Sequence, residues 1–555
     1  ATDAKRLTGL VILGIRDRDT FPLIFYREDC ADMAIGAGDI DPAFIGSAHA
    51  LLVTGTHFSQ AGVAAASRAA MRAARHAGTQ VILDIDYRPV LWGLTGHGQG
   101  EERFVACGRV SEHLQSIVVD CDLIVGTEEE IHIAGGTDDT LAALRRVREL
   151  SGAIIVLKRG PLGCVVFPES IPASLDDGIV GRGFEVEVFN VLGAGDAFMS
   201  GFLSGWVAGE SLEACSTYAN ACGALVVSRH GCAPAMPSRR ELDHFMARAA
   251  EIGDVRTDEQ LAHVHRVTTQ RREWSNLCIF ALDNRLALEA MADEVGTPHD
   301  RLKKLKSLLV AGARHAAEEG DIPEPGVIID DRWGEEALYE MARSGNGGFW
   351  VARAVERSGL TPLTFEHEPN VGLNLRTWPR EHVVKCLMRF LPDDEEALQN
   401  EQLLRLERLY RACLTTGHEL LLEILPHEGH TLEGTALVGV MRQVYDRGIK
   451  PDWWKLQPQR DADAWKSFES LLGDRDPFCR GILLLGGGTS LDELGDRFQV
   501  ACRSSVCCGF AVGRTIFAEP SRAWLAGELE DRDVVSQVAE RFLSVVDVWR
   551  QRCDG

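Results

Sequence analysis

The segment NVLGAGDAFMSGF, residues 190–202, combines residue types that could carry out phosphoryl transfer. Gly193, Ala194 and Gly195 stand at the start of a stretch with the apolar character of a helix. A helix N-terminus presents unpaired backbone N–H groups and a positive dipole end, so these residues could hold a phosphate. Asp196 could then accept the proton of an attacking hydroxyl group. A capped helix that follows a glycine turn is the alternative interpretation.

A second kind of chemistry is suggested by Lys455 in KPDWWKLQP, residues 450–458. Apolar surroundings such as Trp453 and Trp454 lower the pKa of a lysine and leave a neutral amine, which can form a Schiff base with a ketone. Lys385, in the apolar run VVKCL, is the competing candidate for this role. The alternative for Lys455 is a lysine that extends its ammonium group from an amphipathic segment into water.

Short apolar runs alternate with helical patterns in the first part of the chain. Buried strands that alternate with helices predict a parallel α/β sheet, in which ligands bind at the carboxyl ends of the strands. Residues 7–29, which precede this pattern, predict a β-hairpin around the polar turn RDRD. The expected strands are residues 48–55, 79–89, 122–130 and 153–160, with a helix at 62–78 among the segments between them.

A second strand series occupies the C-terminal half. Its eight βα units over about 280 residues predict a (β/α)8 barrel. We therefore expect an α/β domain at residues 1–245, a charged linker at 246–272 and a barrel domain at 273–555. The expected barrel strands are residues 276–283, 326–333, 348–356, 382–390, 419–426, 452–458, 481–487 and 509–517.

Chemistry in such a barrel lies at the C-terminal ends of the strands. Loops after the seventh and eighth strands commonly bind phosphate, and Gly487, Gly513 and Arg514 stand there. Asp330 and Asp331 offer an alternative metal site, although no histidine cluster supports one. The charged residues expected at strand ends are Asp283, Asp330, Asp331, Glu356, Lys385, Glu423 and Lys455.

The composition excludes several classes of partner. The 555 residues carry a formal net charge of −24, and no domain has the basic footprint that nucleic-acid binding needs. We find no signal peptide and no apolar run of about 18 residues, so no membrane partner is expected. The 15 cysteines are scattered without a CxxC pair, which predicts reduced thiols and a cytoplasmic protein.

Five segments, taken in order, resemble the signatures of the PfkB/ribokinase family of sugar kinases. The first segment considered above is similar to the family motif DTxGAGDxF, with Asn190 and Val191 in place of its Asp-Thr pair. The other segments are DIDYRP (84–89), GTEEE (126–130), LKRGPLG (157–163) and YANACGALVVSRHGCAPAMP (218–237).

This resemblance implies a ribokinase-like three-layer α/β/α fold with ATP and Mg²⁺ as ligands. It places Lys158, Gly160 and Asn220 near the nucleotide, and Glu130 near Mg²⁺ through a water molecule. Family members begin with further strands and a GGxxxN-type substrate motif. The resemblance therefore also implies that the N-terminal part of this domain is missing from the chain.

Within the family, the stretches FPLIFYRE, DIDYRPVLW and NVLGAGDAFMSGFLSGW are most similar to the 5-dehydro-2-deoxygluconokinases of inositol catabolism. Arg27 and Arg88 are candidates for binding a sugar-acid carboxylate, because a guanidinium group pairs with it in a forked geometry. A structural ion pair is the alternative for each arginine. Such kinases often pair through their hairpins, so a homo-oligomer is also expected.

The second domain resembles the barrel fused to such kinases in bacteria, which is similar to class I aldolases of the tagatose-bisphosphate type. The resemblance implies a Schiff base at Lys455 without an organic cofactor, although Gln457 stands where an acid is common. Asp283, Lys385 and Glu423 are then candidates for contacting the substrate. The stretches that carry the resemblance are FALDNR, IIDDRWG, HVVKCLMRFLPDD, ELLLEILP, KPDWWKLQP and GFAVGRTIF.

The two domains together suggest consecutive reactions on a small sugar acid and its phosphate. The kinase would phosphorylate 5-dehydro-2-deoxygluconate at O6, and the barrel would cleave the product to dihydroxyacetone phosphate and malonate semialdehyde. The new phosphate would bind to Gly487, Gly513 and Arg514. One alternative is a kinase of a related keto-sugar acid with a barrel of other lyase specificity. Another is a non-catalytic scaffold that binds sugar phosphates.

Overall fold

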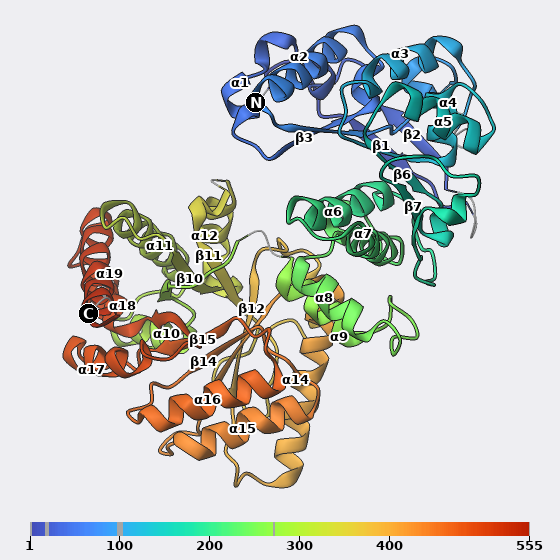
Figure 1. Ribbon diagram of the computed structural model, residues 1–555. Coiled ribbons are helices and arrows are strands. Elements are labelled where there is room, and N and C mark those ends of the chain that lie inside the picture. Colours follow the sequence, from blue (N-terminus) through green and yellow to red (C-terminus); the bar gives the residue numbers. More distant parts are fainter. Residues whose placement is uncertain (1–2, 17–20, 97–103, 270–271, 344, 554–555) are drawn as a thin grey trace. The chain divides into compact units, whose positions relative to one another are not determined.

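The computed structural model describes residues 3–16, 21–96, 104–269, 272–343 and 345–553. It divides into two compact units, Ala1–Thr269 and Gln270–Gly555 (Figure 1). Each unit has its own hydrophobic core, as expected for a chain of this length.

The first unit is built on a six-stranded sheet with the order β3-β4-β5-β6-β7-β8. The first four strands pair in parallel, and β7 pairs antiparallel with both β6 and β8. The four predicted strands are therefore confirmed, whereas β7 and β8 were missed because they are only four and three residues long. The strands are β3 (Ala50–Thr54), β4 (Gln80–Asp84), β5 (Leu123–Thr127), β6 (Ile154–Lys158), β7 (Cys164–Phe167) and β8 (Ile179–Gly181).

Helices cover both faces of this sheet. Successive strand residues point to opposite faces, so Val81 and Leu83 pack in the core on one side while Ile82 packs in the core on the other. Helices α2 to α5 cover the first face, and α6 and α7 cover the second, which gives three α/β/α layers. The helices are α1 (Pro42–Gly46), α2 (Ala61–Ala77), α3 (Gly108–Val118), α4 (Glu128–Gly135), α5 (Thr140–Leu150), α6 (Ala194–Val207), α7 (Leu212–Val227), α8 (Arg239–Arg248) and α9 (Glu259–Thr268).

The predicted N-terminal hairpin is confirmed. Strands β1 (Leu10–Leu13) and β2 (Leu23–Tyr26) pair antiparallel as a separate two-stranded sheet. Residues 17–19 of the predicted turn RDRD lie outside the described residues.

The second unit is a closed barrel of eight parallel strands, which confirms the predicted (β/α)8 architecture. Its last strand is shorter than predicted, because the chain enters α18 at Arg514. The strands are β9 (Leu277–Ala281), β10 (Pro325–Asp330), β11 (Trp350–Ala354), β12 (Val383–Arg389), β13 (Leu420–Leu425), β14 (Trp453–Leu456), β15 (Gly481–Leu485) and β16 (Cys507–Val512). The helices are α10 (Arg285–Glu294), α11 (Arg301–Glu319), α12 (Asp331–Arg343), α13 (Val371–Leu375), α14 (Glu396–Thr416), α15 (Gly434–Asp446), α16 (Ala462–Arg475), α17 (Leu491–Ala501), α18 (Arg514–Leu525) and α19 (Asp531–Cys553).

The barrel interior changes from apolar to charged along the strands. Alternate residues of each strand point inward, and the lower inward positions hold an apolar cluster that includes Ala281, Val383, Leu421 and Trp453. Two residues farther along the same strands, the chain carries a charge. We call Asp283, Glu356, Lys385, Glu423 and Lys455 the charged layer; it lies at the C-terminal end of the barrel.

The structure differs from the predicted linker at residues 246–272. Helix α9 packs against α8 and buries Leu261 in one cluster with Leu242 and Phe245. Residues up to Thr269 therefore belong to the first unit, because the charged segment carries an apolar helix face that finds a partner there.

Two further observations concern the cysteines and the helices. Cys502 and Cys553 form a disulfide between the C-terminal ends of α17 and α19, whereas the sequence predicted reduced thiols. Within the described part of the chain, no helix combines the length and the apolar character that crossing a bilayer requires.

The close contact of β16 with β9 leads to a stability prediction. Gly509 has φ 136°, and a Cβ atom there would lie 2.0 Å from the carbonyl oxygen of Leu277. We expect Gly509→Ala to lower the free energy of unfolding of the barrel by about 2–3 kcal/mol, because both backbones must shift. Urea denaturation followed by tryptophan fluorescence measures this loss. The control is Gly439→Ala in α15, where nothing lies within 4 Å of the added methyl; equal stability of the two variants would contradict the prediction.

Candidate active sites in the two units

The N-terminus of α6 has the form predicted for an anion site. Gly193 is the residue before the helix and has φ 84°, a left-handed conformation that suits glycine. Ala194 and Gly195 then open the first turn, and Asp196 follows them with its side chain exposed. Loss of solvation and the nearby Asp86 carboxylate raise the pKa of Asp196. The structure thus places the acid in the first turn of α6, beside the backbone N–H groups of the helix start, and the roles of base and anion site stay predictions.

Lys158, at the C-terminal end of β6, reaches this corner. Its Nζ atom lies 3.1 Å from Asp84 Oδ1 and 3.6 Å from Glu130 Oε2. It also lies 3.7 Å from the position that a Cβ atom on Gly195 would take. Burial lowers the pKa of Lys158, but the two carboxylates outweigh it and hold the pKa above its usual value. The structure thus brings a permanent positive charge next to the first turn of α6.

Arg88 and Glu130 form an ion pair in the same region. Arg88 donates to Glu130 Oε1 at 3.3 Å and to the carbonyl oxygen of Tyr87 at 2.9 Å, and it pairs with Asp86 at 2.7 Å. Asp86 itself has φ 32°, which is uncommon outside glycine. The structural ion pair that the sequence left open for Arg88 is therefore present, and its substrate role stays a prediction.

The carboxylate of Glu130, which is predicted to lie near Mg²⁺, already has several partners in the protein. Glu130 accepts the backbone N–H of Thr127 at 2.8 Å and caps α4, in addition to its contacts with Arg88 and Lys158. In the part of the chain that the structure describes, no group of three or more potential ligand side chains could hold a metal ion. Glu130 is therefore engaged by the protein, and its predicted contact with Mg²⁺ through a water molecule stays a prediction.

Three other predicted kinase residues lie in structural contacts. Arg27, directly after β2, pairs with Asp32. Asn220, on α7, donates to the carbonyl oxygens of Gly181 and Arg182 and so fastens the helix to the end of β8. Gly160 forms the turn between β6 and β7 with φ 55°. The amide of Asn220 is therefore engaged by the backbone, and nucleotide contacts of Gly160 and Asn220 remain predictions.

Lys385 is the centre of the charged layer in the barrel. Its Nζ atom lies 2.7 Å from Asp283 Oδ2, 3.1 Å from Glu356 Oε1 and 3.0 Å from Glu423 Oε2, and the side chain is almost fully buried. Burial lowers the pKa of Lys385, but the three carboxylates raise it by more and keep the pKa well above its usual value. Lys385 is thus a fixed ammonium ion.

Lys455 contacts one carboxylate of the same layer. Its Nζ atom lies 3.0 Å from Glu423 Oε2, the oxygen that Lys385 also contacts. The predicted apolar setting is wrong, because neighbouring strand residues point to opposite sides. Trp454 faces the outer helices and bonds Tyr445, while Trp453 lies in the apolar cluster below the layer. The ammonium group lies next to Glu423, on the adjacent strand β13, instead.

Several charged partners were not predicted as a site. Arg285 contacts Glu356 at 3.0 Å and Glu366 at 2.8 Å, which fixes the carboxylate that holds Lys385. The sequence indicates Glu356 only as a charge at the end of a strand. Arg285 follows the FALDN stretch directly, but no spacing rule connects it to a glutamate 71 residues away.

The alternative metal site at Asp330 and Asp331 is contradicted. Asp330 pairs with Lys306 at 2.7 Å, and Asp331 pairs with Arg353 at 2.7 Å. Adjacent residues at the end of a strand point apart, so the two carboxylates serve different ion pairs.

The predicted phosphate loops meet at the C-terminal end of the barrel. Gly487, after β15, has φ 64° and accepts a hydrogen bond of 3.2 Å from Arg514 Nη2. Gly513 precedes α18, which Arg514 begins. The structure therefore brings these three residues together, as the sequence predicted.

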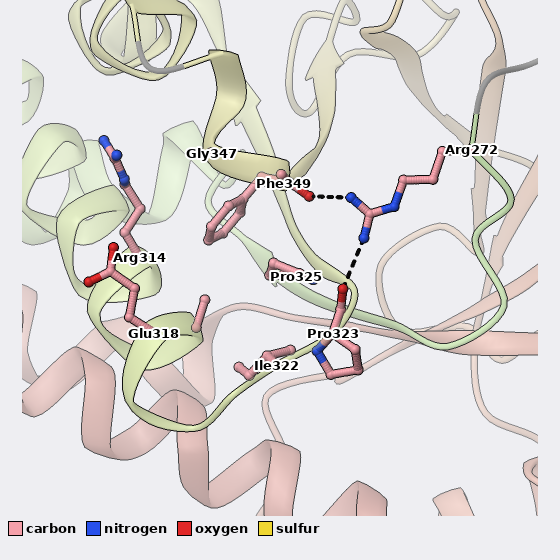
Figure 2. A pocket seen from close by; sticks show the side chains of 10 residues that line it. Arg272, Arg314, Glu318, Ile322, Pro323, Pro325, Gly347 and Phe349 are labelled. Atoms are coloured by element: carbon pink, nitrogen blue, oxygen red, sulfur yellow. Dashed lines mark hydrogen bonds between the residues drawn. The ribbon is translucent and has the colours of Figure 1, made fainter. Parts of the chain in front are cut away.

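A hollow of about 200 Å³ lies elsewhere in the second unit (Figure 2). Its lining includes Pro325, at the start of β10, and Phe349, just before β11. Arg272 bridges the carbonyl oxygens of Gly348 and Pro323 at its edge. Because the hollow lies at the N-terminal ends of the strands, it is at the opposite end from the charged layer and is not a candidate active site.

Comparison with known proteins defines the class of each unit. Residues 99–239 match the pfkB family of carbohydrate kinases, and the first unit has a kinase domain of this family with a ribokinase-like fold. Residues 241–553 match the family described as "Uncharacterized protein conserved in bacteria (DUF2090)". This match covers more than half of the chain, and the chain belongs to that family. The matched region begins before the barrel and includes α9.

Individual relatives match the first unit. The 5-dehydro-2-deoxygluconokinase of Geobacillus kaustophilus is 28% identical over 244 residues, which are 43% of this chain and 68% of the relative. The enzyme of the same name from Listeria monocytogenes serotype 4b is 29% identical over 248 residues, 44% of this chain and 70% of the relative. The crystal structure of a PfkB protein from Polaromonas sp. JS666 is 27% identical, with a TM-score of 0.34, and covers 43% of this chain and 72% of that one.

Proposed function

We propose that the first unit is an ATP-dependent kinase that phosphorylates 5-dehydro-2-deoxygluconate at O6, and that the barrel cleaves the resulting phosphate. The observation that carries the kinase proposal is the meeting of Asp196, Gly195 and Lys158 at the N-terminus of α6. The substrate is suggested by the 5-dehydro-2-deoxygluconokinases that match this unit at 28–29% identity.

The kinase step needs a base, an anion site and a positive charge. Asp196 accepts the proton of the O6 hydroxyl, whose oxygen attacks the γ-phosphorus of ATP while the bond to ADP breaks. The N–H groups of the first turn of α6 and the ammonium of Lys158 stabilise the negative charge on the transferred group. Mg²⁺ would arrive with the nucleotide and neutralise its phosphates.

The barrel step needs a free amine and a carboxylate that moves protons. The amine of Lys455 adds to the C5 ketone, and water leaves as the imine forms. A carboxylate of the charged layer, Glu423 or Asp283, then takes the proton of the C3 hydroxyl. The C3–C4 bond breaks toward the iminium nitrogen, which releases malonate semialdehyde. Protonation of C4 and hydrolysis of the imine release dihydroxyacetone phosphate and restore Lys455.

The phosphate links the two steps. Gly487, Gly513 and Arg514 lie at the same end of the barrel as the charged layer, and a guanidinium beside glycine N–H groups suits a phosphate. A substrate phosphorylated by the first unit would therefore carry the group by which the barrel holds it.

Incubation of the full chain with Mg-ATP and 5-dehydro-2-deoxygluconate tests both halves, with products followed by mass spectrometry. We expect dihydroxyacetone phosphate and malonate semialdehyde, and neither product without ATP. Accumulation of the phosphorylated acid alone would support the kinase and contradict the aldolase. If no product forms, the kinase proposal fails, and the phosphorylated acid supplied directly tests the barrel by itself. Parallel incubation with related keto-sugar acids tests the alternative specificity.

A further inference from the structure

A cluster of polar side chains, separate from the N-terminus of α6, lies beside the C-terminal end of β3. His57 belongs to the short 3-10 helix Gly55–Phe58 that follows this strand. Arg27 directly follows β2, and Asp32 begins the 3-10 helix Asp32–Ala34. Three segments that are separate in the sequence thus place a guanidinium, a carboxylate and an imidazole together.

The cluster has hydrogen-bonding atoms that the protein does not satisfy. Arg27 binds one oxygen of Asp32, Oδ2. The other oxygen, Oδ1, is buried and has no hydrogen-bond partner among the described residues, and the same holds for His57 Nε2. His57 Nε2 lies 3.9 Å from Asp32 Oδ2, too far for a hydrogen bond. Buried polar atoms left without a partner destabilise the protein, so the cluster is suited to a ligand that supplies the partners.

The charge state of the cluster decides which ligand fits. Burial and the Arg27 guanidinium lower the pKa of His57, and they outweigh the opposite effect of Asp32. The imidazole is therefore neutral at neutral pH and can donate one N–H. Arg27 contributes a positive charge, and Asp32 Oδ1 can only accept. A carboxylate on Arg27 and His57, together with a hydroxyl that donates to Asp32, satisfies all three groups.

The position of the cluster relates it to the base of the kinase. Strand β3 pairs with β4 in parallel, with Thr54 opposite Asp84, so the segments after both strands leave the same edge of the sheet. The Asp86 carboxylate acts electrostatically on both His57 and Asp196. One extended molecule could therefore offer a hydroxyl to Asp196 and its opposite end to the cluster.

We propose that His57 and Asp32, with Arg27, bind the carboxylate end of a polyhydroxy acid, which adds His57 and Asp32 to the determinants of substrate specificity. This proposal rests on the proposed kinase function, because it places the acceptor in the site of Asp196. It explains why an acid, rather than a neutral sugar, would be preferred.

Equilibrium binding tests the proposal without requiring turnover. Isothermal titration calorimetry compares D-gluconate, a polyhydroxy acid, with sorbitol, a neutral polyol of the same length. We expect the unmodified chain to bind gluconate more tightly than sorbitol. His57→Ala and Asp32→Asn should each weaken gluconate binding about tenfold or more, as expected for hydrogen bonds to charged groups. His57→Gln keeps a hydrogen-bond donor, so its affinity for gluconate should lie between that of the unmodified chain and that of His57→Ala.

The matched control is His49→Gln, an exposed histidine just before β3, at the opposite edge of the same strand. It should bind gluconate like the unmodified chain, and circular dichroism reports whether each variant is folded. Unchanged gluconate binding in both His57→Ala and Asp32→Asn, or no binding to the unmodified chain, would overturn the proposal. His57-dependent binding of gluconate without phosphorylation of any acid would retain this site and reject the kinase function.

Discussion

Asp196→Asn is expected to lower kcat for phosphorylation of the sugar acid by about a thousandfold, within the range that general base catalysis supplies. The amide keeps the size of the side chain but cannot take the proton of the attacking hydroxyl. The α6 N-terminus and Lys158 are untouched, so ATP affinity should change little. Steady-state kinetics with a coupled ADP assay measures kcat, and fluorescence titration with an ATP analogue measures affinity.

A control for this experiment lies in the loop after the same helix. Glu210 is an exposed acid beyond the C-terminal end of α6, and Glu210→Gln removes the same charge far from the anion site. It should leave kcat within about twofold, since surface substitutions change little. An Asp196→Asn enzyme that retains most of its activity would contradict the role of Asp196 as the base. Equal losses of kcat in both variants would point to a charge effect on the unit as a whole.

The kinase corner was predictable because its parts are contiguous. Gly193, Ala194, Gly195 and Asp196 are consecutive, so one helix N-terminus fixes their geometry whatever the rest of the fold does. The contacts of Lys158 could not be predicted in this way, because its partner is distant in the sequence. Its ammonium is held by Asp84, 74 residues earlier in the chain, and only the pairing of neighbouring strands brings the two together.

The barrel shows the same limit in another form. The alternation of strands and helices predicted the closed barrel, and the strand ends predicted all five residues of the charged layer. The surroundings of Lys455 were wrong because its sequence neighbours are tryptophans while its spatial neighbour is Glu423, on the adjacent strand. Which lysine contacts which carboxylate depends on the register between neighbouring strands. That register cannot be read from a single sequence.

Lys455→Ala is expected to abolish covalent trapping of the phosphorylated acid by borohydride, and to slow its cleavage by roughly a thousandfold or more, as for loss of a nucleophile. The structure favours Lys455 over Lys385 for the imine because of the number of carboxylates each contacts. Lys385 is held protonated by three, Asp283, Glu356 and Glu423. An ammonium ion is not a nucleophile, and among the described residues Lys455 forms an ion pair with one carboxylate, that of Glu423.

Two further variants separate the roles of these lysines. Lys385→Met should still be trapped by borohydride, although less, because the imine forms on Lys455 while the charged layer has lost its central cation. Lys466→Ala, on the exposed side of α16, removes an amine outside the barrel interior and should be trapped fully. Mass spectrometry of proteolytic peptides locates the label. A label on Lys385, or continued trapping in Lys455→Ala, would reverse the assignment, because the amine that forms the imine must lose its proton first. Lys385 would then have to lose its proton during the reaction, although three carboxylates stabilise its ammonium form.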